Sequence, residues 1–218
     1  MLRRFLLGFF FTAFASAAAD AHPHVWTEMR SSLMVDAQGL VTGVRMEWTF
    51  DEAYSGFALD GLDSNGNGTF EPDEIKPLTD ENIANLAESD YFGFMRLDGK
   101  ALPHAPVTDY AQTYNANRLT LYFVLPLATP VDPRKGRFQY QVYDPDFFIS
   151  FDYVKDDPVE LEGKLPQGCR WELKPFMSDA EIEAKRNFLS EKGADWTNDT
   201  GEDFGSLFAR PVVVTCAP

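Results

Sequence analysis

The segment from Asp63 to Glu74 carries oxygen-bearing groups at the spacing of a calcium loop. An EF-hand loop needs oxygen ligands at positions 1, 3, 5, 7, 9 and 12, and a glycine at position 6, which here is Gly68. Three of the ligands are carboxylates, so we expect weak binding in the extracellular class, about 10⁻⁴–10⁻³ M, and a structural ion. The predicted calcium ligands are Asp63, Asn65, Asn67, the Thr69 carbonyl, Glu71 and Glu74.

Two of the three histidines, His22 and His24, are only two residues apart. Residues at that spacing share one face of a strand, so both imidazoles could reach one ion. Imidazole nitrogens suit zinc, copper and nickel. Two ligands do not make a site, so a third would come from elsewhere, for instance His104 or Asp144. The alternative is that both histidines simply begin a surface strand.

Residues 1–21 have the composition of an export signal. A short positive start precedes an apolar run over residues 5–14, and residues 19–21 form an A-x-A cleavage site. The run is too short to span a bilayer, which takes about 20 apolar residues. Cleavage after residue 21 leaves His22 first, where its α-amine could join the ligands, whereas cleavage after Ala17 leaves a short tail before it. We expect ordinary secretion into a bacterial periplasm.

The composition excludes two broad classes. The formal charge is -15, from 19 basic and 34 acidic side chains. A protein that binds nucleic acid by neutralising phosphates needs the opposite balance, so no nucleic-acid partner is expected. The hydrophobic fraction of 44% is too high for a disordered chain. Acid-rich proteins often meet cations, which agrees with the calcium loop.

The chain has two cysteines, Cys169 and Cys216. A pair of cysteines in an oxidising compartment predicts one disulfide, which would tie the C-terminal segment back across a loop. A metal-thiolate pair is the weaker alternative, because neither cysteine sits in a C-x-x-C motif.

The pattern of strands and helices predicts an α+β fold. Residues 25–35 and 40–50 read as the two arms of a long β-hairpin. Residues 51–62 and most of 73–89 are expected to be helical, with a break at Pro77 and a cap from Thr79 at the start of the longer piece. Further strands are expected at 92–97, 119–125, 138–143, 147–154, 171–173 and 212–214.

The expected architecture is a single periplasmic domain over residues 22–218. It is a mainly antiparallel β-sandwich in which residues 51–90 form an inserted, EF-hand-like helix–loop–helix. A C-terminal helix is predicted from Ser178 to Lys192, because Ser178 is a good N-cap with Glu181 at the capping-box spacing.

Several short motifs occur together in this chain, and their combination resembles a bacterial exported family known as the domain of unknown function number one thousand and seven. Its members are described as the periplasmic component of an uncharacterised ABC-type transport system. They often appear beside nickel/cobalt or zinc transport proteins, which implies metal handling but no catalytic residues. The motifs are His22-Pro23-His24-Val25-Trp26, Trp48-Thr49-Phe50-Asp51-Glu52, Gly61-Leu62-Asp63, Asp90-Tyr91-Phe92 and Tyr143-Asp144-Pro145.

These observations predict a periplasmic metal-binding accessory protein of a zinc, nickel or cobalt transport system rather than an enzyme. Calcium would order the loop, and a transition metal at His22 and His24 would be delivered to a membrane transporter. No common hydrolase, metalloprotease or nucleotide-binding motif is present. Two alternatives stay open. One is a copper-dependent oxidative enzyme that uses the terminal histidine, and the other is a purely structural, calcium-stiffened binding module.

Overall fold

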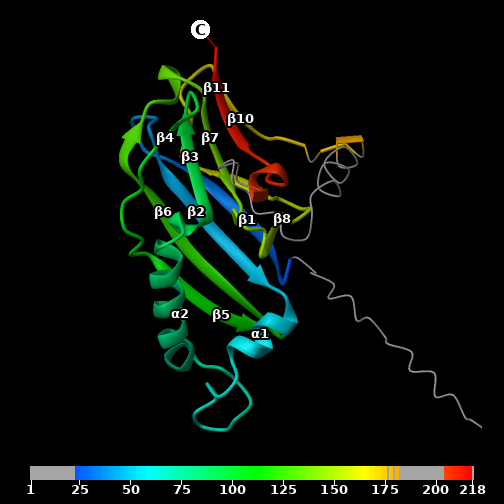
Figure 1. Cartoon of the computed structure of the whole chain (residues 1–218). Coiled ribbons are helices and arrows are strands. Elements are labelled where there is room, and N and C mark those ends of the chain that lie inside the picture. The colour runs from blue at the N-terminus through cyan, green and yellow to red at the C-terminus, as the bar shows by residue number, and fades with distance from the viewer. Residues whose placement is uncertain (1–22, 176, 179, 182–203, 218) are drawn as a thin grey trace, which may run out of the picture.

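Two β-sheets, connected by a helical segment, form the fold (Figure 1). The computed structural model describes residues 23–175, 177–178, 180–181 and 204–217. Within them, sheet A has the strand order β5-β6-β2-β1-β8, with β9 also paired to β1, and sheet B has the order β10-β11-β7-β3-β4. The strands are β1 Val25–Val35, β2 Val41–Phe50, β3 Gly93–Leu97, β4 Lys100–Ala101, β5 Tyr110–Asn115, β6 Arg118–Val131, β7 Phe138–Val142, β8 Ile149–Tyr153, β9 Val159–Glu162, β10 Cys169–Leu173 and β11 Val212–Cys216.

The predicted hairpin is confirmed as β1 and β2, which lie side by side in the middle of sheet A and pair antiparallel. The alternation along β2 buries Val44, Met46, Trp48 and Phe50, as a half-buried strand requires. Sheet A also contains parallel pairs, because β8 and β9 both run alongside β1 in the same direction. Within sheet A, strands β5 and β9 were not predicted from the sequence.

The two sheets contribute to one hydrophobic cluster, which includes Trp48 of sheet A and Tyr140 of sheet B. Gly93 of β3 lies so close to the Leu125 side chain of β6 that a Cβ at this position would clash with it. A glycine here lets the sheets approach each other. The predicted α+β class is therefore confirmed at the level of two sheets and two α-helices among the described residues.

A chain of three hydroxyl groups crosses this core. The Ser31 Oγ of β1 lies 2.7 Å from the Tyr140 hydroxyl of β7 and 3.3 Å from the Tyr153 hydroxyl of β8. Burial raises the pKa of Tyr140 well above its usual value and that of Tyr153 to about 12. Both tyrosines therefore stay neutral at physiological pH, and the three hydroxyls satisfy one another in the interior.

The first helix, α1 (Glu52–Ala58), directly follows β2. It is shorter than the predicted 51–62, because the chain turns at Leu59, whose carbonyl accepts a 3.0 Å hydrogen bond from Leu62 N. Asp51 caps the helix through Oδ1, which accepts from Tyr54 N at 2.9 Å.

The second helix, α2 (Pro72–Ala87), runs without interruption through Pro77, so the predicted break there is wrong. Pro77 is exposed, and the one backbone hydrogen bond it cannot donate is lost on the solvent side of the helix. The buried residues Ile75, Thr79 and Ile83 hold the other side against the core. Thr79 is not a cap either, because its hydroxyl donates to the Ile75 carbonyl at 3.1 Å.

Two predictions concern segments that lie wholly or mostly outside the described residues. These are the signal peptide over residues 1–21 and most of the C-terminal helix over 178–192. At the start of that helix, Ser178 N donates to Glu181 Oε2 at 2.8 Å, and Glu181 N donates to Ser178 Oγ at 3.4 Å, which is the predicted capping-box pair. None of the helices that the structure describes is both long and apolar enough to cross a membrane.

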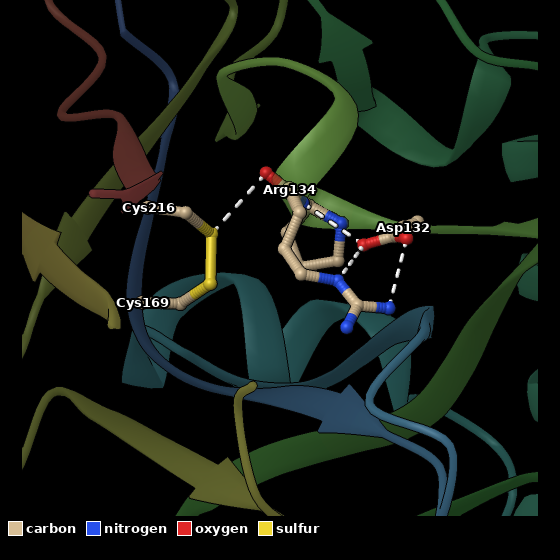
Figure 2. The surroundings of a disulfide bond; sticks show 5 residues. Asp132, Arg134, Cys169 and Cys216 are labelled. Atoms are coloured by element: carbon tan, nitrogen blue, oxygen red, sulfur yellow. Dashed lines mark hydrogen bonds and ion pairs between the residues drawn. A yellow bond between two sulfur atoms is a disulfide. The ribbon is translucent and has the colours of Figure 1, made fainter. Parts of the chain in front are cut away.

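The predicted disulfide between Cys169 and Cys216 is confirmed. The two cysteines face each other on the neighbouring strands β10 and β11. Figure 2 shows the bond beside the turn that contains Asp132 and Arg134, where the Cys216 sulfur lies 3.3 Å from the Pro133 carbonyl oxygen. The bond thus closes the edge of sheet B and fixes the last strand of the chain.

Replacing both Cys169 and Cys216 by serine should lower the stability of the fold. The chain-entropy model assigns about 4 kcal/mol to a crosslink closing a loop of this size. For a protein of this length we expect the melting temperature to fall by roughly 8–16 °C. Thermal unfolding with and without reductant measures the melting temperatures of the wild type and the variant. The wild type should respond to reductant and the variant should not; equal melting temperatures would contradict the assignment.

Candidate metal centre

The loop between α1 and α2 is wound around the side chain of Asp63. Its Oδ1 accepts hydrogen bonds from Gly66 N at 2.8 Å and Asn67 N at 3.1 Å, and its Oδ2 accepts from Gly68 N at 2.9 Å. Gly68 has a φ of +78°, a conformation that glycine adopts without strain. Asp63 and Gly68, the first and sixth positions of the predicted calcium loop, are therefore neighbours in space.

Two asparagine side chains connect this turn to Glu71. Asn65 Nδ2 donates to Glu71 Oε2 at 3.2 Å, and Asn67 Nδ2 donates to Glu71 Oε1 at 2.9 Å. Their Oδ1 atoms accept from the backbone N–H groups of Asn67, at 3.0 Å, and Thr69, at 2.7 Å. Positions three, five and nine of the motif are thus neighbours in space.

Glu74 closes the loop from the first turn of α2. Its Oε1 accepts from Ser64 N at 2.9 Å and from the Ser64 hydroxyl at 2.6 Å, while its Oε2 accepts from Glu71 N at 3.2 Å. The hydrogen bond from the Ser64 hydroxyl, followed by those involving Glu71, lowers the pKa of Glu74 to about 2. The carboxylate is therefore ionised throughout the physiological range.

The chemistry of this donor set fits a calcium ion. Calcium prefers carboxylate, amide and backbone carbonyl oxygens, which are the groups that the loop presents. Among the described residues, no three His, Cys, Asp or Glu side chains form a group that could hold a metal ion. Within the loop, the amide groups of Asn65 and Asn67 bridge to the Glu71 carboxylate. A bound ion would take the place of these bridges and would compensate the carboxylate charges directly.

Phe70, at the eighth position of the loop, packs against the core rather than against a second loop. Its ring meets the ring of Tyr114 on β5 edge-to-face, with 5.1 Å between the centroids. Here a strand of sheet A supplies the apolar contact, so the loop is anchored to the fold on its own.

His24 is exposed at the start of β1. Its backbone N donates to the Phe148 carbonyl at 2.8 Å, and its imidazole ring lies 4.7 Å from the Phe148 ring. His22 lies outside the described residues. The structure therefore places one of the two predicted imidazoles at the protein surface.

The two groups named as further ligands for this ion are already engaged elsewhere. The His104 Nε2 lies 3.2 Å from Asp90 Oδ1, and its Nδ1 lies 3.3 Å from the Ala105 carbonyl oxygen. Asp144 is buried, and its two oxygens accept from Asp146 N and Ile149 N, both at 3.0 Å. Asp144 thus organises a turn.

Contacts that the sequence did not reveal join the helical segment to sheet A. Asp51 Oδ2 accepts from Trp26 N of β1 at 2.9 Å, besides capping α1. Burial would raise the pKa of Asp51, but the N–H groups of Tyr54 and Trp26 outweigh it and lower the pKa. Arg118 of β6 donates to the Phe50 carbonyl and to the Glu28 carboxylate, both at 2.7 Å. These partners are distant in sequence, so no local pattern marks them.

Comparison with known proteins gives a family but no activity. A family model described as "Protein of unknown function (DUF1007)" matches residues 7–216. A relative from Spirochaeta aurantia, described as an uncharacterized 15.5 kDa protein in the trpE 3′ region, is 32% identical over 100 residues. The matched region covers 46% of this chain and 71% of that protein.

Acid titration should show that Glu74 is held ionised by the loop. Because its pKa is lowered, the stabilising contribution of its hydrogen bonds is fully present above its ordinary pKa of 4.5 and is lost as pH falls toward about 2. A Ser64→Ala variant lacks the hydroxyl donor, so we expect the pKa of Glu74 to move back up toward its ordinary value. Side-chain carboxyl NMR measures the pKa of Glu74 in the wild type and in the variant. An unchanged pKa in the variant would contradict the hydrogen bond from Ser64 to Glu74.

Proposed function

We propose that this chain, which belongs to the family described as protein of unknown function (DUF1007), is an exported protein that binds calcium in the loop from Asp63 to Glu74. The observation that supports this most directly is the closure of the loop on itself. Asn65 and Asn67 donate to Glu71, and Ser64 donates to Glu74, so hydrogen bonds hold the predicted ligand residues from the two ends of the loop together. No other part of the described chain gathers so many oxygen ligands in motif order.

In this proposal the ion has a structural role. Asp63 belongs to the end of the loop that follows α1, whereas Glu74 belongs to the first turn of α2. An ion bound to both would fix the connection between the two helices. The affinity expected for three carboxylates, about 10⁻⁴–10⁻³ M, suits calcium levels outside the cytoplasm. Both oxygens of Glu74 would turn from Ser64 and Glu71 toward the ion, which is the bidentate arrangement typical of the twelfth position.

A pair of charge-matched variants tests the calcium site. Glu74→Gln removes the bidentate ligand, and we expect it to weaken calcium binding by at least about tenfold, since a bidentate carboxylate is the strongest ligand of such a loop. Asp73→Asn removes the same charge one residue earlier, at a position that is not a ligand, and should change the affinity only slightly. Isothermal titration with calcium measures all three proteins. Equal binding by the wild type and Glu74→Gln would rule out the assigned site.

We also propose that the exported protein carries a transition metal at its mature N-terminus and passes it to a membrane transporter. The observation in favour is that His24 is exposed at the first strand, next to the predicted start of the mature chain. With His104 paired to Asp90, the ligands would be His24, the imidazole of His22 and the terminal amine. Zinc, nickel or copper suits such nitrogen donors.

The position of the N-terminus gives a sharp test of this second proposal. A chain that begins at His22 should bind zinc more tightly than one that begins at Ala18, because only the first can use its terminal amine together with the imidazole. His24→Ala should weaken zinc binding in the chain that begins at His22. His104→Ala should leave zinc binding unchanged, because His104 pairs with Asp90. Competition with a zinc dye reports the affinities. If zinc, nickel and copper all fail to bind the His22 chain, the delivery role has no physical basis; redox cycling by bound copper would favour an enzyme.

A further inference from the structure

A cavity of about 160 Å³ lies between the helical segment and the inner face of sheet A. Strands β2, β6 and β8 contribute to it from the sheets, and α1 and α2 contribute from the helices. Its lining residues are Trp48, Phe50, Tyr54, Asn82, Asn85, Leu86, Ser89, Leu121 and Ile149.

The lining changes from polar to apolar with depth. Asn85 and Ser89 are exposed, whereas Trp48, Phe50 and Leu121 are buried. Among the residues that the structure describes, no Asp, Glu, Lys, Arg or His lines the cavity. A charged ligand would therefore lose its hydration without gaining a countercharge, so the lining selects for an uncharged molecule with an apolar body.

Trp48, which lines the cavity, carries a buried hydrogen-bond donor. Trp48 is only 1% exposed, and its indole Nε1–H finds no acceptor among the described residues. Its neighbours there are the rings of Phe123 and Phe151, at centroid distances of 4.8 Å and 4.6 Å. An unpaired donor in the interior carries a free-energy cost that a ligand with an acceptor oxygen would remove.

The helix above the cavity is held in place by polar contacts with β5. Thr79 Oγ1 lies 3.2 Å from Gln112 Oε1, and Asn82 Nδ2 lies 3.5 Å from the same atom. Gln112 stands opposite Leu121 on β6, and Leu121 stands opposite Trp48 on β2. The cavity is therefore bounded by α2 on one side and by the paired strands β6 and β2 on the other, and contacts through β5 fix both sides.

We propose that this cavity binds a small uncharged molecule with an aromatic or aliphatic body and one acceptor oxygen, such as an aryl ketone. An apolar cavity of about 150 Å³ holds benzene, so the ligand would have about six to ten non-hydrogen atoms. The acceptor oxygen pairs with the Trp48 N–H, and the apolar body contacts Phe50, Leu86 and Leu121. This site goes beyond calcium binding and does not depend on it.

Two probes of the same shape test the proposal on the mature protein, with EDTA present so that calcium plays no part. Acetophenone carries the acceptor oxygen, and isopropylbenzene is the matched hydrocarbon. We expect acetophenone to bind with a dissociation constant on the order of 1 mM or tighter. Isopropylbenzene should bind about tenfold more weakly, which corresponds to one net hydrogen bond. Ligand-detected NMR titration measures both.

Two kinds of variant locate the binding. Trp48→Phe removes the donor and leaves the ketone oxygen unpaired, so acetophenone should lose its preference and bind no more tightly than isopropylbenzene. Leu86→Phe and the bulkier Leu86→Trp fill the cavity and should abolish binding of both probes, while thermal unfolding shows that each variant is folded. The proposal is overturned if neither probe binds the wild type, which would mean that water alone occupies the cavity. It is equally overturned if the Leu86 variants bind as the wild type does, or if Trp48→Phe keeps the tenfold preference.

Discussion

Burial of the inner face of β2 is the constraint on which the other parts of this structure depend. Its side chains Met46, Trp48 and Phe50 lie between the two sheets or beneath the helices, and β2 is paired along both edges, with β1 and with β6. A shift of one residue in this strand would turn all of them toward solvent. The strand also ends at Asp51, which begins α1, so the register of β2 sets where the helical segment and its loop start.

The features that the sequence predicted correctly are those determined by neighbouring residues. The alternation along β2 and the hairpin that joins it to β1 are both local patterns. The break expected at Pro77 failed because tertiary burial of Ile75 and Ile83 outweighs the loss of one exposed hydrogen bond. Strand β5 was missed because its sequence is short and polar. It is a strand because it pairs with β6 and packs against α2, and neither contact is visible in a local pattern. The engagement of His104 by Asp90 depends on contacts between distant segments, which spacing does not reveal.

The helical segment between β2 and β3 connects the two sheets, contains the proposed calcium loop and covers the proposed ligand cavity. The loop at its middle presents hard oxygen donors to water, whereas α2 covers an apolar cavity with its opposite end. The two sites therefore differ in chemistry although they share one helix. Two contacts attach this region to β5 at separate points: the Phe70 ring packs on Tyr114, and Thr79 of α2 contacts Gln112. Helix α2 therefore joins the loop to the cavity as one element that is fixed to sheet A.

The parallel pairing of β1 has a consequence for the order in which the molecule can assemble. Residues 25–35 are made early, yet their partners on one side, within 149–153 and 159–162, are made more than a hundred residues later. The hairpin can close at once, but the other edge of β1 stays open until the C-terminal half of the chain exists. Such long-range pairing slows folding, because the entropy of closing the chain is lost before the contacts form. Until then the open edge offers unpaired backbone groups to any other strand, which makes the unfinished chain a natural client for chaperones.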